Sequence, residues 1–335
     1  MRGTHFSAGR FVAAMAACVV VAVVAFGLAV ALGEQPLSWA EVRTPGSAGE
    51  LIFFSLRLPR VVLAALVGAA LAAAGAMLQS LLRNPLADPF VLGVSGGAAL
   101  GATVALALGV SSLAWLPGLS ATSAFALAGA IGATALVLLV GRLAGGNSPT
   151  TTLLAGVIFN AFALAAITFI KALVAPDKLG EILFWLAGTL GHESWATLGS
   201  TSAVVLLALA VLVALSPRLN LLTLGEEDAQ SLGVDVRLTR RVLLVTASLA
   251  VAAVVSLSGL VGFVGLLVPQ LVRLVFGPDQ RVAVPASAVL GAAFLMLADL
   301  AARLLFRVFQ TEPPVGVITA LLGGPVFLLL MARRK

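Results

Sequence analysis

Residues able to do chemistry are few in this sequence, and one pair lies inside an apolar segment. Asp299 is the one acidic residue deep in such a segment, and Arg303 follows it by four positions. On a helix this spacing places both side chains on one face, where they can form a structural ion pair. An ionisable group within a membrane is also a candidate for proton or ion transfer. The residues themselves leave both hypotheses open.

A second group of charges lies in the longest polar stretch, residues 216–241. Glu226, Glu227 and Asp228 suit the first turn of a short helix, because the positive end of the helix dipole favours acidic side chains. Gly233 suits the end of that helix. Such an amphipathic helix either lies along a membrane surface or forms a docking surface for a partner.

Two cations, Arg57 and Arg60, flank Leu58-Pro59 at the expected mouth of an apolar segment. Long basic side chains at such a position commonly extend toward lipid headgroups. Arginine also pairs well with carboxylates of a partner protein. The sequence predicts one of these two surface roles.

A glycine run precedes a proline near the C-terminal third of the chain. Gly259, Gly262 and Gly265 recur at intervals of three before Pro269, and Gln270 follows. Irregular backbone at membrane depth is tolerated where it is enclosed by protein or lines a cavity. We therefore predict a broken helix here that contributes to a pathway.

Composition identifies the elements that must position these residues. Of the 335 residues, 61% are apolar and only 10% are charged, against about a quarter in soluble domains. The mean hydropathy is +1.13. The chain is therefore expected to be an all-α, polytopic membrane protein, a single transmembrane domain over residues 1–335. At about 20 residues per span, the apolar residues suffice for about ten helices.

Several classes of protein are excluded. Basic residues are scattered singly between apolar runs, which does not indicate nucleic-acid binding. One cysteine and two histidines provide neither a disulfide framework nor a metal site, and no cofactor is expected on this chain. No GxxxxGK[ST] motif occurs, so ATP-driven work requires a separate ATPase. A membrane-embedded enzyme is not expected, because the sequence offers no nucleophile–His pair.

Ten apolar stretches are expected to be the spans. The first, 11–33, is longer than the apolar core of a signal peptide, so we expect a retained span although Ala29-Val30-Ala31 resembles a cleavage site. An even number of spans places both termini on one side. If that side is the cytoplasm, 13 of the 20 basic residues lie on the cytoplasmic side. Cytoplasmic loops carry an excess of basic residues, so this count favours cytoplasmic termini. The remaining stretches lie near 60–82, 90–110, 119–141, 151–174, 195–216, 242–260, 262–276, 283–306 and 314–331.

Small residues recur four apart within these stretches, as in Gly68 with Ala72 and Ala76, Gly97 with Gly101, and Gly141 with Gly145. This spacing lets helices approach closely in lipid. Tight packing within the bundle is the expected use. A role in a moving gate is the alternative, and the sequence does not separate the two.

Taken together, these segments resemble the permease family of bacterial ABC importers for ferric siderophores, haem and cobalamin. Five motifs in register carry the resemblance, and they extend from residue 57 to residue 327. They are RLPRVVLAALVGAALAAAGAMLQSLLRNPLADPFVLGVSGGAALGA (57–102), LGEEDAQSLGV (224–234), GLVGFVGLLVPQLVRL (259–274), LADLAAR (297–303) and PPVGVITALLGGPVF (313–327).

The resemblance implies a ten-helix subunit of an inner-membrane importer with separate partners. These are a second permease copy, two copies of a cytoplasmic ATPase that uses the ATP, and a periplasmic binding protein with acidic docking residues. Arg57, Arg60 and Arg303 would meet those acids. The loop about 217–241 would couple to the ATPase through Gly225, Glu226, Glu227, Ala229, Leu232, Gly233 and Val234.

The chain departs from the family pattern at one position. Many members have VPHxxR where this sequence has VPQLVR, so Gln270 replaces a histidine. Glutamine neither titrates nor ligates metal as histidine does, so no such role carries over. The motifs do not discriminate siderophore, haem and cobalamin. An ion-coupled carrier using Asp299 is the alternative function.

Overall fold

The computed structural model describes residues 7–36, 38–110, 120–143 and 149–332. All regular elements in these ranges are helical, as the composition predicts. The helices are α1 (Ala8–Ala31), α2 (Trp39–Arg43), α3 (Ala48–Leu51), α4 (Leu58–Leu81), α5 (Val94–Leu108), α6 (Ala121–Leu143), α7 (Pro149–Leu173), α8 (Pro176–Leu186), α9 (Trp195–Ala214), α10 (Ser216–Leu224), α11 (Glu226–Ser231), α12 (Val236–Ser258), α13 (Val264–Phe276), α14 (Gln280–Phe309) and α15 (Val315–Ala332). A π-helical turn, η1 (Ile52–Arg57), precedes α4, and a 3₁₀ turn, η2 (Pro89–Leu92), precedes α5.

Seven helical segments of the described chain are long and apolar enough to cross a membrane: α1, the continuous stretch Ala48–Leu81, α6, α7, α9, α12 and α14. Three shorter apolar helices, α5, α13 and α15, occupy the other predicted stretches. The chain is therefore a multi-pass membrane protein.

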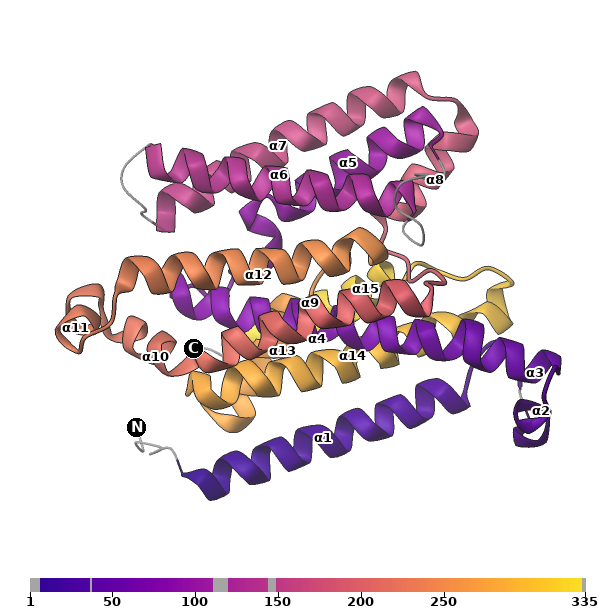
Figure 1. The fold of residues 1–335 in the computed structure, drawn as a ribbon, viewed down its shortest axis with the longest axis horizontal. Coiled ribbons are helices and arrows are strands. Elements are labelled where there is room, and N and C mark those ends of the chain that lie inside the picture. Colours follow the sequence, from indigo (N-terminus) through magenta and orange to yellow (C-terminus); the bar gives the residue numbers. More distant parts are fainter. Residues whose placement is uncertain (1–6, 37, 111–119, 144–148, 333–335) are drawn as a thin grey trace.

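The long helices run roughly side by side and give the molecule two ends (Figure 1). Helices α10 and α11 lie at one end, together with the start of α1, and we call it the α11 end. Helices α2 and α3 and the last turn of α1 lie at the opposite end, the α3 end.

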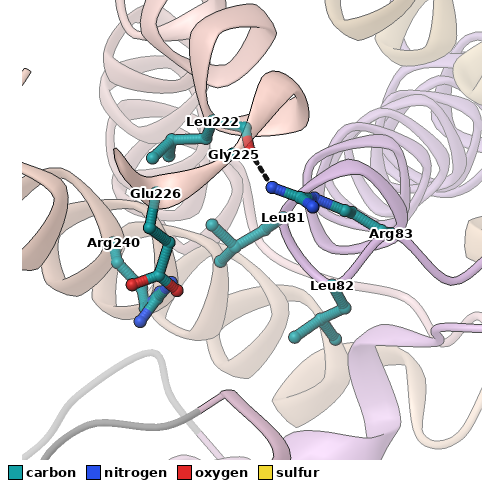
Figure 2. Close-up of a pocket in the computed structure, with 7 residues that line it drawn as sticks. All are labelled: Leu81, Leu82, Arg83, Leu222, Gly225, Glu226 and Arg240. Atoms are coloured by element: carbon teal, nitrogen blue, oxygen red, sulfur yellow. Dashed lines mark hydrogen bonds and ion pairs between the residues drawn. The ribbon is translucent and has the colours of Figure 1, made fainter. Parts of the chain in front are cut away.

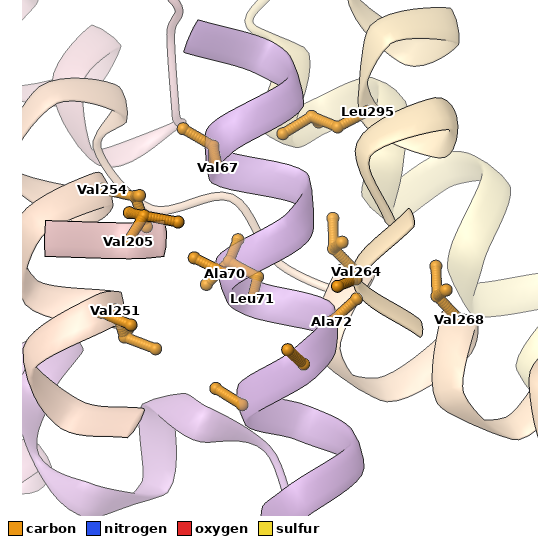
Figure 3. Close-up of a cluster of buried hydrophobic side chains, with 14 of the residues drawn as sticks. Val67, Ala70, Leu71, Ala72, Val205, Val251, Val254, Val264, Val268 and Leu295 are labelled. Carbon is orange, nitrogen blue, oxygen red and sulfur yellow. The ribbon is translucent and has the colours of Figure 1, made fainter. Parts of the chain in front are cut away.

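Helix α4 lies at the centre of the bundle. Of its most apolar 18-residue window, 78% of the residues are buried, against 17% for α1 and α7. Val67, Leu71 and Ala72 pack between α9 and α12 on one side and α13 and α14 on the other (Figure 3). Helices α5, α6 and α7 form a separate layer that contacts the centre through α12 (Figure 1).

Glycine–glycine contacts allow this density. A Cβ atom built on Gly68 of α4 would lie 2.1 Å from the carbonyl oxygen of Gly291 in α14, and one built on Gly291 would lie 2.4 Å from the Cβ of Ala72. The same arrangement joins Gly97 of α5 to Gly129 of α6. The small-residue spacing in the sequence therefore serves close helix packing.

Two of the boundaries that differ from the sequence-based expectation concern charged residues. Helix α12 begins at Val236 and not near residue 242, because the Asp235 side chain accepts a hydrogen bond from the Leu238 N–H group (2.9 Å) and caps the helix. The helical stretch that contains Arg57 and Arg60 begins at Ala48, so these residues lie within it and not at its mouth. Pro59 has no N–H group to donate within a helix, and the π-helical turn that precedes it lets the helical stretch continue through this position.

We predict that Gly68→Ala destabilises the protein by about 1–3 kcal/mol, the usual cost of overpacking, because the new methyl group would collide with the backbone of α14. Thermal unfolding of the purified protein in detergent measures the effect. Gly132→Ala is the matched control, since a Cβ atom there meets nothing within 4 Å. Equal unfolding temperatures for the two variants would contradict the close packing of α4 on α14.

Candidate functional site

A buried charge cluster lies at the α3 end. The Asp299 carboxylate in α14 is fully buried and accepts from two guanidinium groups, Arg60 Nε to Oδ1 and Arg303 Nε to Oδ2, both at 2.8 Å. Arg60 also donates to the Glu312 carboxylate in the α14–α15 loop (3.1 Å from Nη1 to Oε2). The structural charge pair expected from the sequence is therefore present, with Arg60 and Glu312 as further members.

The other arginines at this end bind backbone carbonyl groups where α1 ends. Arg57 donates to the carbonyl oxygens of Val30 (3.2 Å) and Gln35 (2.7 Å), and Arg303 donates to that of Ala29 (2.9 Å). Arg307 donates to the Glu34 carbonyl oxygen (3.1 Å). The last carbonyl groups of a helix have no partner within the helix and carry its negative dipole end. These arginines therefore fasten α1 to α4 and α14.

Both surface roles considered for Arg57 and Arg60 assume exposed side chains, whereas the side chains are buried in this structure. Arg57, Arg60 and Arg303 are only 7%, 8% and 4% exposed. Their guanidinium groups face partners within the chain because residues 29–35 and Asp299 surround them with acceptors. Docking of a partner by these arginines stays a prediction.

The cluster also bears on the ion-coupling hypothesis for Asp299. The carboxylate is fully buried and each of its oxygens accepts a hydrogen bond from a guanidinium group, an arrangement typical of a structural ion pair. The carrier alternative is not favoured.

Glu34, just beyond α1, is a member that the sequence did not single out. Burial raises the pKa of the Glu34 carboxyl, and the neighbouring Glu312 carboxylate raises it further. Glu312, Glu34 and Arg307 lie in or next to connecting loops. Of these three residues, only Glu312 had a signal in the sequence, because it directly precedes the 313–327 motif.

At the α11 end, helix α11 has the predicted form. Glu226, Glu227 and Asp228 occupy its first turn. At its end, the Gly233 N–H group donates to the Gln230 carbonyl oxygen (2.9 Å) and the Val234 N–H group to that of Ala229 (3.0 Å), which is a Schellman motif. Gly233 has a φ of +81° and Gly225 a φ of +154°, conformations that favour glycine.

Helices α10 and α11 are held to the bundle by two basic side chains. Arg240 of α12 forms an ion pair with Glu226, and Arg83, just after α4, donates to the Leu222 carbonyl oxygen at 2.8 Å (Figure 2). A cavity of about 270 Å³ lies between these groups. The first contact ties α11 to α12, and the second ties α10 to the end of α4.

The surface of α11 mixes acidic and apolar groups. Leu224 and Leu232 are 62% and 61% exposed, and Glu227 and Asp228 are exposed beside them. Ala229 and Val234, by contrast, are buried against the bundle. Exposed leucines beside acidic groups fit both expectations for this loop, contact with the membrane surface and contact with a partner.

Asn220 of α10 connects this region to α14, and the sequence analysis missed it. Its side-chain Nδ2 donates to Asp279 Oδ1 (2.7 Å), and its Oδ1 accepts from the Gln280 N–H group (2.8 Å). These two hydrogen bonds join α10 to the first turn of α14.

The predicted broken helix is present between α12 and α13, where residues 259–263 are not helical. Gly259 has a φ of +64°, and a Cβ atom there would lie 2.2 Å from the Trp185 carbonyl oxygen. The Thr189 N–H group donates to the Ser258 carbonyl oxygen (2.9 Å). Gly262 has open space where a Cβ atom would stand. The break packs against the turn after α8, and its part in a pathway stays a prediction.

Pro269 lies within α13 and does not end it. Proline cannot donate to the carbonyl oxygen four residues earlier, which here belongs to Gly265. The Gln79 side chain of α4 donates to that oxygen instead (3.0 Å). Gln270 is 5% exposed and donates to the Pro85 carbonyl oxygen (2.8 Å), so it holds α13 to the turn after α4.

That turn, residues 82–88, contains a carboxyl group with altered acidity. Asp88 is half-buried, its Oδ1 accepts from the Phe90 N–H group (2.8 Å), and burial raises its pKa to about 6.

Comparison with known proteins agrees with this architecture. The model of the FecCD transport family matches residues 19–333. The cobalamin import system permease protein BtuC of Halobacterium salinarum is 45% identical over 287 residues, which cover 85% of this chain and 74% of that protein. The hemin transport system permease protein HmuU of Yersinia pestis is 40% identical over 85% of this chain and 84% of its own length. A solved metal-chelate type ABC transporter in an inward-facing conformation superposes with a TM-score of 0.84 at 30% identity, covering 95% of this chain and 98% of that chain.

We predict that Arg60→Met destabilises the protein by about 3–5 kcal/mol, because it leaves the buried Asp299 with one guanidinium group in place of two. Adding Asp299→Asn to this variant is expected to recover part of the loss, since the uncompensated charge is removed. Thermal unfolding in detergent measures both.

Arg43→Met, an exposed arginine at the same end, is the control for charge removal alone. An unfolding temperature of Arg60→Met equal to that of the control would show that the cluster is not structural.

The raised pKa of Asp88 predicts a pH-dependent effect. The folded protein holds this proton more tightly than the unfolded chain, so the contribution to stability is complete below about pH 4 and is lost as the pH rises through 6. Asp88→Asn keeps the oxygen that accepts from Phe90 and carries no charge. It is expected to raise the unfolding temperature at pH 7.5 and to leave it nearly unchanged at pH 4. A gain of equal size at both pH values, or the same profile for the control Asp235→Asn, would contradict this assignment.

Proposed function

Since the chain belongs to the FecCD transport family, we propose that it is the membrane-spanning subunit of an ATP-driven importer for a metal-chelate nutrient. Ferric siderophore, haem and cobalamin are the candidate substrates, as the names of the relatives suggest. The chain itself is then a transport permease, and a separate subunit hydrolyses ATP.

The observation that carries the proposal is the form of helix α11. It is short, ends in a Schellman motif and is joined to α12 by the ion pair of Glu226 with Arg240, while Arg83 joins the preceding α10 to the end of α4. It presents Glu227, Asp228 and Leu232 outward at one end of the bundle. A rigid protruding helix of this kind suits the transfer of movement from an ATPase, two copies of which would bind a pair of permease subunits.

In this proposal the seven long apolar helices and the three shorter ones, α5, α13 and α15, make ten crossings. The α11 end is then cytoplasmic and the α3 end periplasmic, in agreement with the excess of basic residues on the α11 side. The location is the inner membrane. A second copy of the chain completes the transporter.

A binding protein would dock at the α3 end. Arg57, Arg60 and Arg303 stay the proposed docking residues, in contact with acidic groups of that partner. Because they are almost fully buried, docking by their variants is measured at a temperature at which each variant remains folded.

Uptake into proteoliposomes tests the proposed function. The vesicles contain this chain, a candidate ATPase and a candidate binding protein of the same organism, and the panel is haem, cobalamin and a ferric siderophore. We expect ATP-dependent accumulation of one compound. Uptake that continues without ATP and the ATPase would refute an importer.

A variant of α11 tests coupling in the same vesicles. Glu227→Lys with Leu232→Ser changes only exposed side chains, whereas Glu226→Lys would also break the ion pair with Arg240. We expect the affinity for the ATPase and the uptake rate to fall about tenfold, equivalent to about 1.4 kcal/mol. Asp177→Lys makes the same charge change at the α3 end and is the control. Unchanged ATPase affinity would remove α11 from the coupling interface.

A further inference from the structure

A groove between α6 and α12 has the two parts that a phospholipid requires. We define the α6–α12 groove by Ile131, Thr134, Ala135 and Leu138 on α6 and by Val245, Ser248, Leu249 and Ala252 on α12. Its volume is about 170 Å³ and its lining is apolar apart from two hydroxyl groups. The two helices lie side by side and belong to the membrane-crossing set (Figure 1).

One of these hydroxyl groups has no partner. Ser248 is 4% exposed, and its oxygen makes no hydrogen bond with the described residues. An unsatisfied buried hydroxyl group costs free energy in apolar surroundings. It marks a position in the groove where an oxygen atom of a ligand would be stabilised.

At the α11 end the groove continues into a hollow bordered by arginines. Leu138 lines both, and one helical turn further the hollow is bordered by Arg142 of α6 and by Arg237, Arg240 and Arg241 of α12. None of the described residues that line the hollow is acidic. Arg240 pairs with Glu226, whereas no carboxylate of the described chain pairs with the other three, which are exposed.

The position of these arginines on α12 is electrostatically unfavourable without an anion. Arg237, Arg240 and Arg241 lie within the first two turns of α12, and the first turn contains no acidic residue. The positive end of a helix dipole repels cations and attracts anions. Asp235, which caps the helix through Leu238, offsets this only in part.

We propose that the α6–α12 groove binds one anionic phospholipid, with an acyl chain between the two helices and the phosphate against Arg142, Arg237 and Arg241. Basic pockets between transmembrane helices are suited to such headgroups. Charge complementarity selects the anionic headgroup, and the apolar groove distinguishes a lipid from a free anion. The inference depends on the membrane location of the chain and not on its transport activity.

The bound lipid would also contact the region of α11. Arg240 lines the hollow and at the same time pairs with Glu226 at the start of α11. An anionic headgroup beside Arg240 would therefore lie next to the proposed ATPase surface.

Native mass spectrometry of the full chain in detergent tests the site. The probes are phosphatidylglycerol and phosphatidylcholine with the same acyl chains, titrated separately. We expect one phosphatidylglycerol to be retained with at least about tenfold preference over phosphatidylcholine. The triple variant Arg142→Gln, Arg237→Gln, Arg241→Gln is expected to lose that preference.

Two controls make the result specific. The variant Arg10→Gln, Arg43→Gln, Arg218→Gln removes the same charge from exposed positions elsewhere and should keep the preference. Ala135→Phe fills the apolar groove and should weaken retention of phosphatidylglycerol about tenfold, whereas Leu139→Phe on the outer face of α6 should not.

Three outcomes would overturn the proposal. The first is equal retention of the two lipids by the unmodified chain. The second is full displacement of phosphatidylglycerol by millimolar inorganic phosphate, which would assign the arginines to a free anion. The third is unchanged lipid retention in the triple variant together with weakened ATPase binding, which would assign them to a protein partner.

Discussion

Helix α4 is enclosed by protein along most of its length, so each polar group on it must find its partner inside the bundle. This constraint organises both ends of the molecule. Arg60, at its start, binds Asp299 of α14, and Gln79, near its end, binds the carbonyl oxygen of Gly265 in α13. Away from water a buried charge or donor without a partner costs several kcal/mol. Arg60 and Gln79 therefore fix α4 against α14 and α13.

The same constraint explains the pairing of irregular backbone with polar side chains. Pro269 leaves a carbonyl oxygen in α13 without its usual donor, and Gln79 supplies one. The carbonyl groups at the end of α1 are satisfied by Arg57, Arg303 and Arg307. Helices can end or bend within an apolar bundle here because a side chain from another helix completes their hydrogen bonds.

The two ends differ in what they leave open. At the α3 end the charges face inward and hold α1, α4 and α14 together. At the α11 end α11 presents leucines and acids outward, while Arg83, Arg240 and Asn220 anchor it and its neighbour α10 from behind. This is a physical basis for fixed packing at one end and a contact surface for a partner at the other.

By itself the sequence determined the all-helical membrane architecture, the family, the acidic first turn and glycine end of α11, and the break before α13. These follow from local properties, namely apolar segment length, acidic residues followed by glycine, and glycine spacing. The Asp299–Arg303 pair was also accessible, because four positions on a helix are adjacent in space. The burial of Arg57 and Arg60 and the roles of Glu312, Gln79 and Asn220 were decided only by the tertiary structure. Their partners lie between about 20 and 250 positions away in the chain, and no local pattern reports which helices an apolar bundle brings together.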